Sequence, residues 1–223
     1  MCGRFTLTLD PGELQEALEL GPFLQLYQPR YNIAPTQPVA LVRDPETRAI
    51  ELFRWGLVPS WAKDISIVNQ MINARGESVH EKPSFRSAFK SRRCLILADG
   101  FFEWSQTTPG QGKTPFYFQV DSGQAFTFAG LYETWRSPEG DELPTCTIIT
   151  CAANELVARY HQRMPVILPP ELRWAWLGQE KDQAALRAML EPYDSQRIQV
   201  REVSRLVNSP GNDNPEILIK NQP

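Results

Sequence analysis

The stretch Cys94-Leu95-Ile96-Leu97-Ala98-Asp99-Gly100-Phe101-Phe102-Glu103-Trp104 decides the fold that we expect for this chain. Its first five residues form an uncharged apolar run of strand length, which predicts a buried strand. The run leads directly to Glu103, which stands between two large aromatic residues. If the rings cover this carboxyl, desolvation raises its pKa toward that of a usable general acid or base. The alternative is an outward-facing strand residue, because Glu103 alternates with Phe102 and Trp104.

Length and composition set the class of protein. The 223 residues suit one sizeable domain with ample length for a core. Hydrophobic residues make up 42% and charged residues 22% of the chain, which is typical of a soluble globular protein. No apolar run approaches the roughly 20 residues of a membrane span, and the N-terminus lacks the pattern of a secretory signal. We therefore expect a cytoplasmic protein with no membrane partner.

Strand and helix signals are mixed along the chain. We expect strands at residues 4–9, 39–42, 50–55, 94–98, 115–120, 125–131, 145–150 and 217–219. We expect helices at residues 11–20, after an Asp10 N-cap, and at 83–90, 171–177 and 181–190. Residues 30–36, 107–113 and 203–208 are expected to form loops. Because no repeat or linker divides the chain, we predict one α+β domain over residues 1–223, with a short tail from about residue 210.

Cysteine and histidine spacing argues against a metal centre. The four cysteines, at positions 2, 94, 146 and 151, contain no CxxC pair. Three of them lie in apolar runs, where free buried cysteine is common, and we expect all four to be reduced thiols. The two histidines, His80 and His161, form no cluster at metal-ligand spacing. We therefore expect neither a metal ion nor another cofactor.

The charge balance limits how the chain could bind nucleic acid. A net charge of −3 argues against a protein that coats nucleic acid by bulk charge, so any such binding needs a local basic patch. The most basic segment holds Arg86, Lys90, Arg92 and Arg93. A charge run of this kind is usually a solvated face, although it is also where a phosphate-facing patch could lie.

The N-terminus, Met1-Cys2-Gly3-Arg4, carries an unusual pair of nucleophiles. Removal of Met1 is expected because the side chain of Cys2 is small. The product has an α-amine and a thiol on adjacent carbons, with reference pKa values of about 7.7–8.0 and about 8.5. An amine condenses with an aldehyde to an imine, and the neighbouring thiol then closes on the same carbon to give a thiazolidine. Intramolecular delivery removes most of the entropic cost of that second step.

Several further residues have both a structural and a functional interpretation. Asn73 and Arg75 are two residues apart and share one side of an extended strand, where they either order a loop or hold a sugar and a phosphate. His161 is either a proton shuttle or a hydrogen-bonded structural histidine. Trp61 is either a core residue or a platform for a base. Pro35 lies either in a connecting turn or in a rigid wall of a site.

Six ordered motifs together resemble one family over nearly the whole chain. They are Met1-Cys2-Gly3-Arg4-Phe5, Tyr31-Asn32-Ile33-Ala34-Pro35-Thr36, Trp55-Gly56-Leu57-Val58-Pro59, Ile72-Asn73-Ala74-Arg75-Gly76-Glu77, Asp99-Gly100-Phe101-Phe102-Glu103-Trp104 and His161-Gln162-Arg163-Met164-Pro165. The tail from Val203 to Asn208 also fits. The chain thus resembles the SRAP family, the SOS-response-associated peptidases, which are also called abasic-site processing proteins.

This resemblance implies a function, a fold and a set of site residues. The function is capture of abasic sites in single-stranded DNA during the DNA damage response, by a covalent thiazolidine crosslink to Cys2. Asn73 would hold the opened sugar, Glu103 would act as acid and base, and His161 would assist ring opening. The predicted DNA contacts are Arg4, Arg75 and Arg163 to phosphates, with Pro35, Trp61 and Trp104 lining the site or stacking on bases, and Thr150 beside them. The implied fold is a compact α+β domain around a curved, barrel-like, mainly antiparallel sheet.

The chemistry leaves other functions open. An N-terminal-nucleophile peptidase or amidohydrolase would use the Cys2 thiol on an acyl carbon, and autoproteolysis could remove Met1. A non-enzymatic single-strand DNA-binding module would need no covalent chemistry. An imine intermediate could also undergo β-elimination and nick DNA as a lyase. The resemblance implies a stand-alone bacterial form that associates with the nucleoid when bound to DNA, and we expect a monomer.

Overall fold

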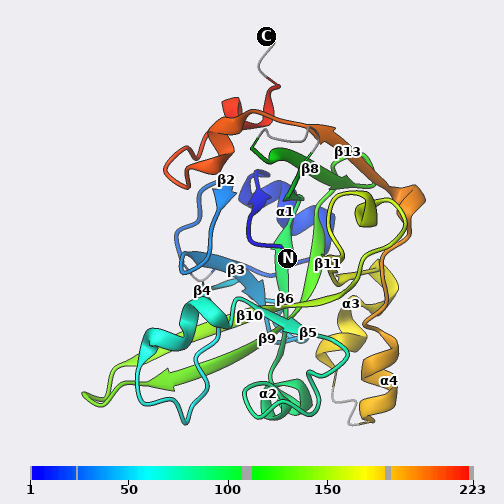
Figure 1. Cartoon of the computed structure of the whole chain (residues 1–223). Helices are drawn as coiled ribbons and strands as arrows, with labels where there is room; N and C mark the ends of the chain where they lie inside the picture. Colours follow the sequence, from blue (N-terminus) through cyan, green and yellow to red (C-terminus); the bar gives the residue numbers. More distant parts are fainter. Residues whose placement is uncertain (1, 24, 107–111, 179–181, 221–223) are drawn as a thin grey trace.

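Two β-sheets make up most of the computed structural model, which describes residues 2–23, 25–106, 112–178 and 182–220 (Figure 1). The strands of the eight-stranded sheet are β3 (Pro38–Val42), β4 (Glu51–Trp55), β5 (Asn73–Arg75), β6 (Arg93–Ala98), β9 (Phe126–Arg136), β10 (Glu142–Ala152), β11 (Arg163–Pro165) and β12 (Ile167–Leu168). The five-stranded sheet has the order β13 (Ile198–Glu202), β8 (Thr114–Val120), β7 (Gly100–Ser105), β1 (Phe5–Leu7) and β2 (Arg30–Ile33).

Five strands of the larger sheet close into a barrel. β10 pairs with β4, β4 with β3, β3 with β6, β6 with β9, and β9 returns to β10. Only the pairings of β10 with β4 and β5 are parallel among those described, so the sheet is mainly antiparallel. Closure leaves no free edge within the ring. The expected α+β fold around a curved, barrel-like sheet is confirmed.

A single buried residue, Asp99, connects the last residue of barrel strand β6 to strand β7 of the second sheet. Asp99 separates β6 from β7, and its carboxylate accepts hydrogen bonds from the hydroxyls of Thr6 and Thr8 and from the backbone N–H of Thr8. These bonds satisfy a charge that would be costly to bury alone. They also hold the N-terminal strand β1 against β7, which places residue 2 at the junction of the two sheets.

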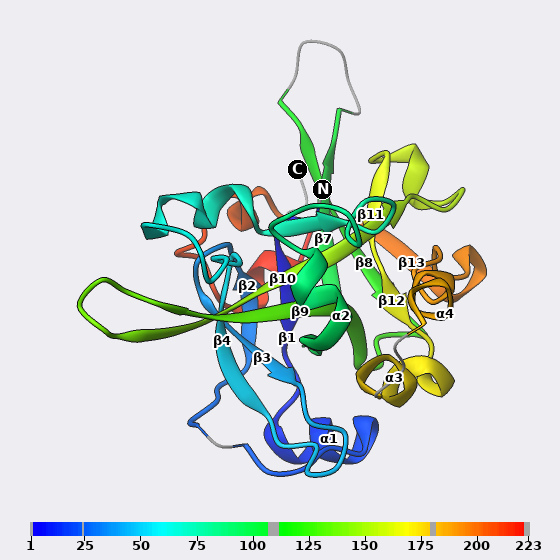
Figure 2. The same cartoon turned by 90° about the horizontal axis from the view of Figure 1, so that it is seen from below.

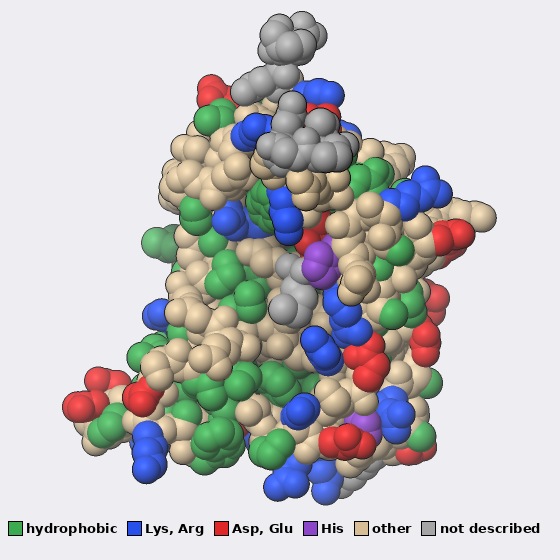
Figure 3. All heavy atoms as spheres, in the orientation of Figure 1, with side chains coloured by type: hydrophobic (Ala, Val, Ile, Leu, Met, Phe, Trp, Pro, Cys, Tyr) green, Lys and Arg blue, Asp and Glu red, His purple; other side chains and the backbone are tan. Residues whose placement is uncertain are grey.

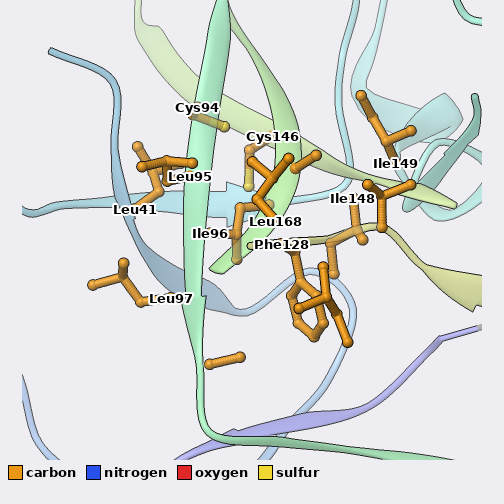
Figure 4. Close-up of a cluster of buried hydrophobic side chains, with 14 of the residues drawn as sticks. Leu41, Cys94, Leu95, Ile96, Leu97, Phe128, Cys146, Ile148, Ile149 and Leu168 are labelled. Carbon is orange, nitrogen blue, oxygen red and sulfur yellow. The ribbon is translucent and has the colours of Figure 1, made fainter. Parts of the chain in front are cut away.

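The core fills the barrel with branched and aromatic side chains. Figure 4 shows Ile96 of β6, Phe128 of β9 and Ile148 of β10 among the labelled core side chains. Trp55 and Phe5 meet edge to face in the same core, with ring centroids 5.2 Å apart. Cys94, Cys146 and Cys151 are buried free thiols, as expected from their apolar runs.

Helices and short 3-10 turns lie around the strands (Figure 2). The α-helices are α1 (Pro11–Leu18), α2 (Arg86–Ser91), α3 (Pro170–Leu177) and α4 (Gln183–Ala188). The 3-10 turns are η1 (Ile65–Gln70), η2 (Val157–Arg159), η3 (Ser195–Arg197), η4 (Arg205–Asn208) and η5 (Pro215–Leu218). Helix α1 begins with the expected Asp10 cap, whose side chain accepts from the Glu13 backbone N–H. No helix in the described part of the chain is both long and apolar enough to span a bilayer.

Some expectations about elements are wrong. Residues 30–33 form strand β2 rather than a loop, because they pair with β1. Residues 217–219 do not form a strand: Asn214 caps η5 and Pro215 starts it. Strands β11, β12 and β13 were not expected, and β9 and β10 are longer than the runs that predicted them. The loop expected at 107–113 falls mainly on residues 107–111, which lie outside the described residues.

Candidate active site

Cys2 lies at the junction of the two sheets and is fully buried. The side-chain amide of Asn73 donates to the Cys2 carbonyl oxygen at 2.9 Å. The other end of that side chain, Asn73 Oδ1, is buried and accepts no hydrogen bond from any described residue. Such an orphaned acceptor is unusual in a folded protein, and here it lies beside Cys2. Met1, whose removal we predict, is outside the described residues.

Strand β5 brings Asn73 to this position. It pairs in parallel with β10, where Ile148 is opposite Asn73 and Thr150 is opposite Arg75. Asn73 and Arg75 therefore share one side of the strand, as their spacing predicts. Arg75 is exposed, whereas Asn73 is half-buried. On this side of the strand, the Asn73 amide contacts Cys2 and the Arg75 guanidinium is exposed to solvent.

Glu103 is buried on β7, with only 3% of its surface exposed, so it is not an outward-facing strand residue. Burial raises the pKa of its carboxyl, and the charge of His161 opposes that shift. The same burial effect, together with the negative charge of Glu103, raises the pKa of the Cys2 thiol. Glu103 therefore lies within electrostatic reach of both Cys2 and His161. A raised carboxyl pKa suits a group that exchanges protons near neutral pH.

The ring of His161 is held by the backbone that follows it. The Arg163 backbone N–H donates to His161 Nδ1 at 2.9 Å, so the neutral ring carries its proton on Nε2. The Arg163 carbonyl oxygen lies 3.0 Å from the same Nδ1 and can accept from it when the ring is protonated. Nδ1 therefore has a backbone partner whether or not it carries a proton, and this fixes the position of the ring.

The guanidinium of Arg163 is oriented by two neighbours. It forms a bidentate ion pair with Glu77, with Nη2 at 2.9 Å from Oε2, and Nη2 also donates to the Thr150 carbonyl oxygen at 2.7 Å. Thr150 itself is fully buried, so its side chain supports Arg163 and does not face solvent. Arg163 pulls the pKa of the Glu77 carboxyl below its usual range.

The C-terminal segment holds Arg4 and Trp104 at the other side of the site. Arg4 Nη1 donates to Asn32 Oδ1 at 2.7 Å and to the Val207 carbonyl oxygen at 2.8 Å. Trp104 Nε1 donates to Asn208 Oδ1 at 2.7 Å. Burial lowers the pKa of the Arg4 guanidinium. In Figure 1 the orange-to-red C-terminal segment lies over β2 and β8, where these contacts form.

The structure brings together most of the predicted site residues. Asn73 bonds to Cys2, and Glu103 lies within electrostatic reach of Cys2 and His161. Arg163, two residues after His161, bonds to Thr150, which is opposite Arg75 in the sheet. Figure 3 shows Lys and Arg side chains on several sides of a hollow in this face, with a histidine at its edge. Two predicted DNA contacts form no hydrogen bond or ion pair with this group within the described part of the chain. Pro35 follows β2 in a turn, and Trp61, 60% exposed, precedes η1.

The basic segment around α2 is only in part a surface patch. Arg93 is buried and donates to four backbone carbonyls, those of Trp176, Phe89, Lys90 and Gly178. Arg92 is paired with Glu133. The interpretation of these two arginines as phosphate-facing is therefore wrong, because both are engaged with the protein. Arg86 and Lys90 remain exposed.

Sequence reasoning missed three residues that organise the site. Asn32 donates to the carbonyl oxygens of Val207, Ser209 and Asn212, so it ties β2 to the C-terminal segment. Glu77 and Asn208 orient Arg163 and Trp104, respectively. Asn32 and Glu77 stand inside motifs that were singled out, but their roles depend on partners far away in the sequence. Among the described residues, no group of three acidic, histidine or cysteine side chains could hold a metal ion.

Comparison with known proteins identifies the family. The family model for SOS response associated peptidases (SRAP) matches residues 1–210. The chain belongs to the SRAP family. A SRAP relative from Bacillus subtilis, abasic site processing protein YoqW, is 45% identical over 98% of this chain and 99% of its own. The chicken abasic site processing protein HMCES is 32% identical over 98% of this chain and 77% of its own.

Solved structures share the SRAP fold described above. A crystal structure of a protein from Bacteroides thetaiotaomicron superimposes with a TM-score of 0.86 at 25% identity, covering 99% of this chain and 100% of that one. A second, from Bordetella bronchiseptica, gives 0.79 at 25% identity and covers 91% of this chain. Both barrel and second sheet are thus common to proteins that share only a quarter of their residues.

Proposed function

We propose that this protein recognises abasic sites in single-stranded DNA and captures them covalently through Cys2, after removal of Met1. One observation carries the proposal: a fully buried Cys2 at the junction of two sheets, with Asn73 bonded to its carbonyl and Glu103 within electrostatic reach of both Cys2 and His161. An abasic site in its open form carries an aldehyde, the electrophile that an adjacent amine and thiol can trap. The names of the curated relatives, abasic site processing proteins, support the same substrate.

The reaction balances without an external oxidant or reductant. The Cys2 amine adds to the aldehyde carbon and gives a carbinolamine, which loses water to form an imine. The thiol then adds to the imine carbon, and its proton passes to the nitrogen, so a thiazolidine ring forms with one water released. Each step moves a proton over a short distance, which is the work of a general acid and base.

The proposed roles follow from the protonation states. Glu103, with its raised pKa, gives a proton to the departing hydroxyl and takes one from the incoming thiol. His161 donates from Nε2 to the ring oxygen of the closed sugar and so frees the aldehyde. The unfilled acceptor Asn73 Oδ1 accepts a hydrogen bond from the new α-amine or from a sugar hydroxyl. Arg4, Arg75 and Arg163 supply the positive charge that a DNA strand needs.

An acyl-transfer reaction at Cys2 has weaker support. A thiol peptidase needs hydrogen-bond donors aimed at the oxyanion of its intermediate. The amide donor closest to Cys2, Asn73 Nδ2, is already bonded to the Cys2 carbonyl oxygen, and the atom left open is an acceptor. Lyase activity, by β-elimination from the imine, fits the same residues and would compete with thiol closure.

The test separates the amine from the thiol. Purified protein is incubated with a single strand that carries one abasic site, and the adduct is measured on denaturing gels and by intact mass. We expect a heat-stable adduct from protein that lacks Met1, and none on an undamaged strand. Cys2→Ala should form no stable adduct, because its thiol is lost. Cys2→Ser should give only an imine that borohydride traps, and Cys146→Ala, a buried thiol remote from the N-terminus, should react normally.

Two results would overturn the proposal. One is an adduct that survives Cys2→Ala after borohydride-free workup. The other is no adduct at all from protein whose mass confirms the loss of Met1. Acetylation of the Cys2 amine gives a further check: it abolishes aldehyde capture but leaves a thiol peptidase its nucleophile.

A further inference from the structure

A second hollow opens beside the reactive centre, with a volume of about 490 Å³. We call it the Arg205 hollow; it is lined by Arg4, Trp104, Gly112, Lys113, Arg205 and Asn208. Its volume is within the range of small-molecule sites, ~300–1,000 Å³. Lys113 and Arg205 do not belong to the predicted DNA contacts, so two of its three cations have no role in the site described above.

All the charged residues that line the Arg205 hollow are positive. No acidic residue lines it, and among the ion pairs of the described residues none involves Arg4, Lys113 or Arg205. Arg4 is half-buried, and its Nε is a buried donor without a partner in the described chain. A sheltered cation without a counter-ion favours an anionic ligand, because a bound anion offsets the cost of its desolvation.

The residues of the Arg205 hollow are connected to the reactive centre and to the capped turn η4. The positive charge of Lys113 lowers the pKa of the Glu103 carboxyl, so Lys113 lies within electrostatic reach of the site. Arg205 begins η4, where the Ser204 hydroxyl caps the turn by accepting from the Leu206 backbone N–H at 3.2 Å. The same turn holds Asn208 against Trp104 and the Val207 carbonyl against Arg4. The turn that carries Arg205 therefore also holds Arg4 and Trp104 in place.

We infer that Arg205 and Lys113 hold the phosphodiester of the nucleotide that adjoins the abasic site, next to Arg4 and Trp104, which are already expected to contact DNA. Three cations around a partly exposed indole match a phosphate linked to an aromatic base. The inference rests on the proposed function for the identity of the strand. It adds a fixed register: the lesion reaches Cys2 when its neighbour occupies the hollow.

Equilibrium binding tests this without the covalent step. The ligand is a labelled single strand with one reduced abasic site, which has no aldehyde and cannot react. We expect Arg205→Ala and Lys113→Ala each to weaken binding about tenfold, the size of one charge-assisted contact. Each should also lower the slope of log affinity against log salt by about 0.7, as loss of one phosphate contact requires. Arg136→Ala, at an exposed arginine of the β9–β10 hairpin, removes the same charge and should change neither.

Altered strands separate the phosphate from the base. A neutral methylphosphonate at the adjoining linkage should weaken wild-type binding and abolish the cost of Arg205→Ala. A baseless spacer as the neighbouring nucleotide should abolish the cost of Trp104→Leu but leave that of Arg205→Ala. The inference is wrong if Arg205→Ala and Lys113→Ala bind like wild type, or if their cost is the same on every strand. Failure of the proposed function looks different: wild type binds the reduced strand but forms no adduct with the aldehyde.

Discussion

At the scale of single residues, Glu103 combines a functional advantage with a cost in stability. Its folded-state pKa is raised by burial, so the folded protein favours the protonated form. The associated stability is fully present below the unfolded carboxyl pKa and is lost as pH rises through the folded value. We therefore expect Glu103→Gln, which cannot ionise, to raise the melting temperature at pH 8 and to have little effect near pH 4. Thermal unfolding across this range measures it.

The same substitution should slow adduct formation about 100-fold, within the range for loss of a general acid or base. Glu142→Gln, an exposed glutamate on the β9–β10 hairpin, is the control and should alter neither property. Equal melting temperatures for Glu103→Gln and wild type at pH 8 would contradict the assigned pKa direction.

Glu77 places a negative charge beside an arginine that is predicted to contact phosphate. Removal of that charge by Glu77→Gln frees Arg163 from its bidentate partner but also from its orientation. We expect tighter binding to any single strand, with a salt slope steeper by about 0.7, and a slower adduct step from the bound state. Fluorescence anisotropy and single-turnover kinetics separate the two effects. Glu51→Gln, which breaks a similar bidentate pair with Arg43, is the matched control. A loss of affinity would contradict this expectation, because it would mean that the orientation of Arg163 by Glu77 matters more for binding than the charge that is freed.

Local sequence was enough to predict some site residues but not others. Cys2 was predictable because one residue supplies both the amine and the thiol. The burial of Glu103 was predictable because its sequence neighbours are aromatic. Asn32 gives no such local signal, because its three carbonyl partners lie in residues 207–212. The support that Thr150 gives to Arg163 likewise depends on the pairing of β10 with β11.

At the scale of elements, one buried arginine joins α2 and α3 to the barrel. Arg93 donates to the carbonyl oxygens of Phe89 and Lys90 at 3.0 and 2.9 Å and to that of Trp176 at 2.6 Å. We expect Arg93→Met to destabilise the fold by about 4 kcal/mol, because it leaves several buried acceptors without donors. Urea unfolding measures this. Arg92→Met, which removes the neighbouring arginine and its partly exposed ion pair with Glu133, should cost less than about 1 kcal/mol. Similar costs for the two variants would refute the structural role of Arg93.

The boundaries of helices and strands were predictable where the sequence has a continuous apolar run or a clear capping residue. Strand β6 and the cap of α1 follow directly from their residues. The outer parts of β9 and β10 escaped prediction because residues 132–136 and 142–144 pair with each other in a partly exposed hairpin, where polar residues are tolerated. Residues 217–219 are apolar, like a strand, but the Asn214 cap and Pro215 determine a 3-10 turn instead.

At the scale of the whole molecule, a net charge of −3 coexists with a basic site. Arg4, Lys113 and Arg205 line one hollow, and Arg163 bonds to Thr150, which is opposite Arg75 in the sheet. We expect affinity for a single strand to fall with salt, with a log–log slope between about −2 and −3.5 if three to five phosphates are contacted. Titrations at several KCl concentrations measure the slope. A slope near zero would mean that the arginines are structural and that the strand is held by other contacts.

The burial of Cys2 has a consequence for how the protein is made. A methionine aminopeptidase must bind the residues on both sides of the bond that it cuts. In the folded protein, however, Cys2 has no exposed surface and its carbonyl oxygen is hydrogen-bonded to Asn73. The segment that secures Arg4, around Val207, is translated long after the N-terminal strand. We therefore expect the proposed removal of Met1 to take place on the nascent chain, before the segment around Val207 covers Arg4. Molecules in which Met1 is not removed before folding then retain it. In these molecules the Cys2 nitrogen stays in the peptide bond to Met1 and cannot react as an amine.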